Sequence, residues 1–117
     1  MDSCDVGQPM KQRDDKQKLS LLISEAERGD ARAQRLLALR YWRGRGVGQN
    51  NAIAAQWMKK AAEQQLVLAE RDLAEFYDRG IGVERDPDEA LRLYKLAAQR
   101  GDPIAEKFLR DLLKNPH

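Results

Sequence analysis

Few residues in the chain have the types and spacing that catalysis or metal binding needs. Cys4 is the only cysteine and His117 the only histidine among 117 residues, which excludes a disulfide framework and a thiolate-rich or histidine-based metal site. No set of serine, histidine and aspartate is available for nucleophilic catalysis. The carboxylates of Asp86, Asp88 and Glu89 are expected on an exposed turn, where no apolar surroundings would raise a pKa. The sequence therefore predicts no catalytic residue, no metal site, no cofactor and no enzyme.

Two glycine-containing motifs have structural explanations. The triplet Arg-Gly-Asp occurs at residues 28–30 and 100–102, and each copy reads as a helix end, a left-handed glycine and an N-cap aspartate. The segment Gly-Arg-Gly-Val-Gly at residues 44–48 lacks the lysine and serine of a phosphate-binding loop. Its glycines are expected to shape a turn between two helices.

Composition favours a helix-rich protein without a strong overall charge. Apolar residues make up 42% of the chain, charged residues 34% and aromatic residues 6%. The net charge of +2 creates no field that would attract nucleic acid or a lipid surface. No segment approaches the ~20 apolar residues of a membrane span, and residues 1–17 lack the apolar stretch of a signal peptide. We expect no nucleic-acid partner, no membrane span and a cytoplasmic location, or a periplasmic one if a leader has been removed.

A repeat of 36 residues organises the chain. Residues 33–65 align with residues 69–101 at 13 identical positions, and shorter matches continue on both sides. Glu25 and Arg110 stand in columns that hold alanine elsewhere, where stacking of the repeats is expected to stop. The predicted organisation is a flexible polar tail at 1–15, a half repeat at 16–30, repeats at 31–66 and 67–102, a terminal half repeat at 103–114 and a tail at 115–117.

Apolar periodicity and capping residues predict six helices. The proposed N-caps are Asp14 or Asp15, Asp30, Asn50 or Asn51, Asp86 and Asp102. The expected helices span about 16–28, 31–43, 52–64, 67–79, 87–100 and 103–114. Alanines at matching positions of both repeats are expected to let paired helices approach closely.

These residues resemble the Sel-one-like repeat family, a relative of the tetratricopeptide repeat. The resemblance rests on Tyr41, the Gly-Arg-Gly-Val segment at 44–47, Trp57, and the alanine pairs at 61–62 and 97–98. It covers about residues 18–114 and implies an all-α fold, a short right-handed α-solenoid of six antiparallel helices. Gln65 departs from the pattern because the family usually has glycine there, so either the turn differs or about 1–2 kcal/mol of backbone strain is tolerated.

The resemblance implies a non-enzymatic adaptor that binds a partner protein or peptide, with bacterial regulation, envelope biology and secretion as typical settings. An alternative is an immunity or inhibitor protein that tightly binds and neutralises one toxin or enzyme. Self-association of the array is left open.

The first helix of each repeat is expected to line the concave side, where a partner would bind. Arg35, Arg71 and Lys107 would form an exposed basic row there, suited to an acidic amphipathic segment. Residues 31–66 carry seven basic and one acidic side chain, a net +6, whereas residues 67–102 carry six basic and nine acidic ones, a net −3. Trp42 is either a binding hot spot or half-buried packing against the first helix, and Trp57 is expected in the core. The candidate partner-binding residues are Arg32, Arg35, Leu39, Trp42, Arg43, Leu68, Arg71, Glu75, Asp78, Arg79, Ile104, Lys107 and Asp111.

Overall fold

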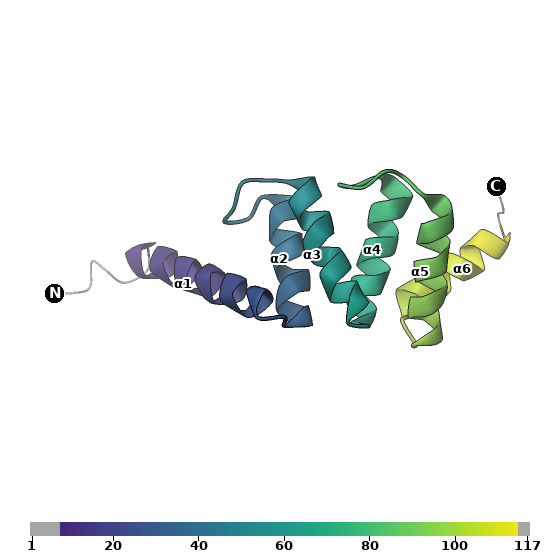
Figure 1. The fold of residues 1–117 in the computed structure, drawn as a ribbon, viewed down its shortest axis with the longest axis horizontal. Helices are drawn as coiled ribbons and strands as arrows, with labels where there is room; N and C mark the ends of the chain where they lie inside the picture. The colour runs from purple at the N-terminus through teal and green to yellow at the C-terminus, as the bar shows by residue number, and fades with distance from the viewer. Residues whose placement is uncertain (1–7, 115–117) are drawn as a thin grey trace.

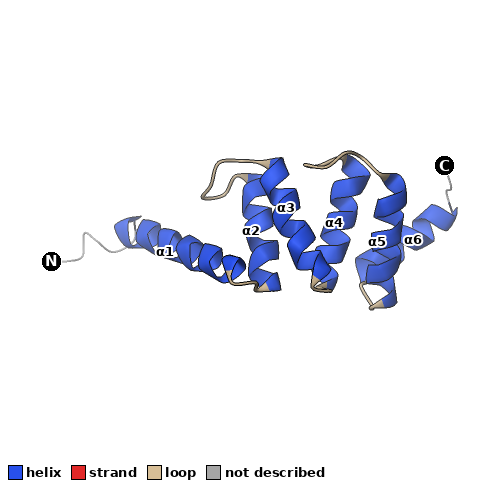
Figure 2. Ribbon diagram, in the orientation of Figure 1, coloured by secondary structure: helices blue, strands red, loops and turns tan. Residues whose placement is uncertain are grey.

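A computed structural model describes residues 8–114, with side-chain positions from residue 17 onward. The described part contains only α-helices, joined by short turns and two longer loops (Figures 1 and 2). The array measures 63 × 26 × 24 Å, and its two ends lie far apart (Figure 1). Each helix packs chiefly against its neighbours in the chain, so the predicted all-α repeat solenoid is confirmed. The helices are α1 (Gln8–Glu27), α2 (Ala31–Arg43), α3 (Asn51–Glu63), α4 (Val67–Arg79), α5 (Pro87–Gln99) and α6 (Pro103–Lys114).

The first helix is longer than the sequence analysis predicts. It begins at Gln8 instead of about residue 16, so Asp14 and Asp15 lie within the helix and do not cap it. Pro9 stands in the first turn, where a helix tolerates proline, and no further glycine or proline interrupts the chain before Gly29. Residues 1–7 of the predicted N-terminal tail, and the predicted tail at 115–117, lie outside the described residues.

Side-chain caps begin four of the helices. The carboxylate of Asp30 accepts a hydrogen bond from the Ala33 amide at 3.0 Å, and Asp102 accepts one from the Ala105 amide at 2.8 Å. Asn50 and Asp86 cap α3 and α5 in the same way. Helix α4 has no such cap, because Leu66 occupies its N-cap position and offers no side-chain acceptor.

The turn before α4 also carries a strained residue. Gln65 has a φ of 67°, and the glycines at the matching positions, Gly29 and Gly101, also have positive φ. The amides of all three residues donate to the carbonyl three positions earlier. The amides of Asp30 and Asp102 also donate to the carbonyls five positions earlier, a bond that the Leu66 amide does not form. The turn at Gln65 thus keeps only part of the pattern, and its left-handed backbone is tolerated.

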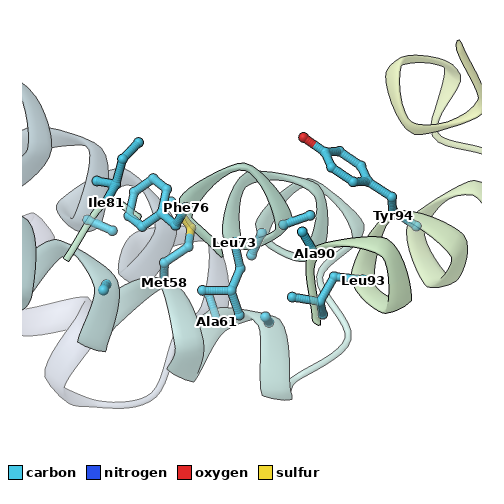
Figure 3. Close-up of a cluster of buried hydrophobic side chains, with 14 of the residues drawn as sticks. Met58, Ala61, Leu73, Phe76, Ile81, Ala90, Leu93 and Tyr94 are labelled. Atoms are coloured by element: carbon cyan, nitrogen blue, oxygen red, sulfur yellow. The ribbon is translucent and has the colours of Figure 1, made fainter. Parts of the chain in front are cut away.

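The main core runs through the two repeats and is built on alanine. Ala38, Ala61, Ala74 and Ala97 are fully buried, as the repeat columns predict. Larger side chains fill the space between helices, and Figure 3 shows residues of α3, α4 and α5 converging there. Trp57 is partly buried and packs against this core and against a smaller apolar cluster under α1, in line with its predicted core position.

Candidate functional site

The expected basic row consists largely of paired charges. Arg35 Nε lies 2.6 Å from a carboxylate oxygen of Asp72 on the next repeat, and Arg71 Nη1 lies 3.3 Å from Asp102. The side chains of Arg35 and Arg71 are only 19% and 17% exposed. Contrary to the sequence-based expectation, these arginines do not form an exposed basic row: Arg35 ties the first repeat to the second, and Arg71 ties α4 to the N-cap of α6. Lys107, the third member, is exposed and pairs with Asp111 on its own helix at 2.8 Å.

Trp42 packs between two repeats. Its ring meets Phe76 of α4 edge to face, with centroids 5.3 Å apart and planes at 63°. The guanidinium groups of Arg43 and Arg79 lie 5.6 and 5.9 Å from its ring centroid. Trp42 is half-buried, but it packs on the following repeat and not on the first helix as the sequence analysis considered.

A polar pair, not foreseen from the sequence, links the two helices of each hairpin, with a buried member on the first helix and an exposed member at the C-cap of the second. In the first repeat, Gln64 donates to the Gln34 side-chain oxygen at 2.9 Å and to the Gly29 carbonyl at 2.8 Å. Gln34 in turn donates to the Ala26 carbonyl at 3.1 Å. The second repeat holds Glu70 and Arg100 at the matching positions. The shared 36-residue spacing was the signal that could have revealed this pair.

In the second repeat the pair is charged, and a buried carboxylate oxygen of Glu70 lacks a hydrogen bond from any described residue. Glu70 is 1% exposed, and its Oε1 accepts no hydrogen bond within the described residues, although Arg100 Nε lies 3.5 Å away. Burial raises the pKa of the Glu70 carboxyl, against the lowering effect of Arg100 and Arg92. Because Glu70 is buried and its neighbour Arg100 belongs to the same repeat, we interpret the pair as structural.

Two hollows flank the exposed face of α2 and share Leu36, which is 48% exposed. The first, of about 320 Å³, lies between α1, α2 and the following loop, and the second, of about 540 Å³, lies between α2 and the start of α4. Together they form what we call the basic surface. The first hollow is lined by Lys18, Leu22, Leu36, Leu39, Arg40, Arg43 and Arg45, and the second by Arg32, Arg35, Leu36, Gln65, Leu66, Val67 and Leu68.

The basic surface combines leucines with cations and has no acidic lining residue in either hollow. Arg32, Arg43 and Arg45 are exposed and form no ion pair with a described residue. Leu68 is 41% exposed and faces the second hollow. Five predicted residues thus share one surface: Arg32, Arg35, Leu39, Arg43 and Leu68. The structure adds Leu36 and the turn at residues 65–67.

The other predicted residues lie elsewhere. Glu75 and Arg79 pair with each other on the surface of α4 at 2.8 Å. Asp78 and Asp111 line a separate groove toward the C-terminal end of the array, and Ile104 is 57% exposed at the start of α6. The single partner-binding face that the sequence predicts is thus divided between separate surfaces.

Within the described residues, no group of three or more His, Cys, Asp or Glu side chains is arranged to hold a metal ion. None of the helices in that same part of the chain has the length and apolar character needed to span a membrane.

Comparison with known proteins identifies the repeats. A family model described as the Sel1 repeat matches residues 31–66 and 67–102. A Sel1 repeat protein from Oxalobacter formigenes has a similar structure, with a TM-score of 0.75 and 37% sequence identity over 77% of this chain and 68% of that one. No curated protein sequence matches the chain significantly.

Two further solved structures have the same fold. A protective antigen of uropathogenic Escherichia coli displaying an SLR fold gives a TM-score of 0.75 at 36% identity, over 78% of this chain but only 20% of the antigen. Helicobacter pylori cysteine rich protein B gives a TM-score of 0.75 at 24% identity, over 80% of this chain and 71% of that protein. At that lower identity the likeness concerns the fold alone.

Proposed function

Because the chain belongs to the Sel1 repeat family, whose members generally mediate protein–protein interactions, we propose that it is a non-enzymatic adaptor that binds an acidic amphipathic segment of a partner protein on its basic surface. The observation that carries this proposal is a leucine-lined surface with several cations and no acidic lining residue. We propose a bacterial regulatory, envelope or secretion-related pathway as its setting, since the similar solved structures come from bacteria.

The chemistry of the basic surface suits an amphipathic helix with acidic flanks. Leu36 and Leu68 offer apolar area to a stripe of large apolar side chains, and the two hollows beside Leu36 can accept successive turns of such a stripe. Arg32 and Arg45 can each bind a carboxylate through two parallel hydrogen bonds. Cations at the rim chiefly set the association rate and its dependence on salt, whereas the leucines provide most of the buried apolar area.

The turn at Gln65 and Leu66 supports the same location. A glycine and a capping aspartate precede α2 and α6, but here the chain keeps a left-handed glutamine and a leucine without a capping oxygen. The missing cap costs about 1 kcal/mol and the left-handed glutamine about 1–2 kcal/mol. Both residues line the second hollow. Local departures of this kind are expected where a sequence serves binding as well as folding.

The experiment is affinity capture from source cells with wild type, Leu36→Glu and Leu21→Glu, read by mass spectrometry. Leu21 is 56% exposed on α1 and lines neither hollow, so it is the matched control for an added surface charge. We expect wild type and Leu21→Glu to capture the same partner and Leu36→Glu to lose it. Equal capture by all three proteins, with unchanged helicity, would refute the proposed site.

A peptide titration tests the charge requirement. The probes are two helical peptides with the same leucine stripe, one flanked by glutamates and the other by lysines. We expect the glutamate peptide to bind at least about tenfold more tightly, and Arg32→Glu with Arg45→Glu to abolish that preference. Equal affinity for both peptides would show that charge does not select the partner.

A further inference from the structure

A second groove lies at the C-terminal end of the array, between the end of α4, the loop before α5, the start of α5, and α6. Its volume is about 680 Å³, larger than either hollow of the basic surface. Its floor is apolar and its rim mostly acidic. We call it the acidic groove, and its lining residues are Asp78, Arg85, Pro87, Asp88, Ala90, Leu91, Phe108, Asp111 and Leu112.

The internal repeat shows what this groove lacks. The 36-residue shift relates Asp78 to Trp42 and Leu112 to Phe76. At the junction between the two repeats, the Trp42 ring packs against Phe76 and fills the space between the units. At the next junction an aspartate and a leucine take those places, and the groove stays open. The sequence position that holds an indole ring at one junction thus recurs without the ring at the other, where Phe108 stacks on Tyr94 beside the groove.

The charges that line the acidic groove indicate which charged groups should accompany an aromatic ring that binds there. Three carboxylates line it against one guanidinium, and Arg85 Nε is held at 2.8 Å by the Asp78 backbone carbonyl. The carboxylates of Asp78 and Asp88 form no ion pair with a described residue. At the first junction, two arginine guanidinium groups lie within 6 Å of the Trp42 ring centroid. Here the chain supplies carboxylates instead, so the cations would have to come with the ligand.

We propose that the acidic groove receives a tryptophan side chain flanked by basic residues from a partner protein, in the manner in which Trp42 fills the equivalent space. This interaction surface is additional to the basic surface. It lies at the other end of the array and selects the opposite charge. Either surface can therefore fail its test without affecting the other, and a protein with both would join two different partners.

The binding test uses a five-residue peptide, acetyl-Lys-Lys-Trp-Lys-Lys-amide, titrated into isotopically labelled full-length protein and followed by NMR. We expect saturable shifts at the amides of Asp78, Asp88 and Leu112, in the weak range of a ligand of that size. The control peptides replace the tryptophan by alanine or the four lysines by glutamates. We expect each replacement to weaken binding at least about tenfold. Equal binding of the alanine peptide, equal binding of the glutamate peptide, or shifts located away from the groove would overturn the proposal.

Variants at Asp78 and Asp88 test whether the peptide binds in the groove. Asp78→Trp restores the residue found at the first junction and should fill the groove, so peptide affinity should fall at least about tenfold. Asp78→Ala, the matched control, also removes a carboxylate but leaves the groove open, and it should weaken binding by less than about threefold. If Asp78→Trp does not fold, the exposed Asp88→Lys variant tests the rim and should also weaken binding. Unchanged affinity in Asp78→Trp, or in Asp88→Lys, would refute the assignment.

Discussion

Replacing Gln65 by glycine should stabilise the protein. Gln65 adopts a left-handed backbone with φ 67°, whereas the matching turns carry Gly29 and Gly101. A non-glycine residue pays about 1–2 kcal/mol for this conformation. Glycine removes that strain but loses about 0.5–1 kcal/mol through the greater freedom of the unfolded chain. The two ranges differ by about 0–1.5 kcal/mol, and we expect a net gain in the free energy of unfolding near the middle of that interval, about 0.5–1 kcal/mol.

The measurement is thermal and urea unfolding of wild type and Gln65→Gly, followed by circular dichroism at the helix band. A gain of this size raises Tm by roughly 2–6 °C for a domain of about 100 residues. The reverse substitution, Gly101→Gln, is the matched control, because a Cβ there would meet no atom within 4 Å and would add only backbone strain. It should lower stability by a similar amount. A loss of stability in Gln65→Gly would show that the glutamine side chain contributes more than its backbone costs, and would refute the reasoning.

Two further substitutions have defined outcomes. Burial raises the pKa of Glu70, so the folded protein must bury a charge once this carboxyl ionises, and its contribution should lower the free energy of unfolding as pH rises from about 4.5 through the folded pKa. Glu70→Gln should remove this loss. By urea unfolding, the variant should be more stable than wild type at pH 7 but not at pH 4. Gly82→Ala should lower the free energy of unfolding by about 3 kcal/mol, because residue 82 has a positive φ and the added Cβ would overlap the Asn51 backbone carbonyl. Gly29→Ala, whose Cβ would meet open space, should lower it by about 1 kcal/mol in the same measurement.

The helices could be predicted because their signals are local. Asp30, Asp86 and Asp102 mark helix starts through bonds to amides three residues ahead, and the glycines after α2 and α4 mark the ends through a left-handed backbone. Such signals depend on a few consecutive residues. The start of α1 was predicted too late in the chain. Asp14 and Asp15 are compatible with either an N-cap or a helix interior, and they were interpreted as N-caps.

The candidate site was harder to predict because its charges pair between helices that are distant in the sequence. Arg35 and Arg71 belong to one column of the repeat, but their acidic partners do not. Asp72 lies within a helix of the next repeat, and Asp102 is also the N-cap of α6. Which acid meets which arginine depends on how successive hairpins stack, and that stacking is not encoded in neighbouring residues. For the same reason the shared role of Leu36 in two hollows became visible only in three dimensions.

The position of α6 has a consequence for dynamics. It packs chiefly against α5 and has no following helix of its own within the described residues, and Leu113 near its end is 82% exposed. Amide hydrogens of α6 should therefore exchange with solvent faster than those of α3 or α4, through local opening that leaves the rest of the array folded. Phe108, Asp111 and Leu112 on this helix form one wall of the acidic groove. A ligand bound there would stabilise the packed position of α6. Binding would therefore slow the exchange of the α6 amide hydrogens.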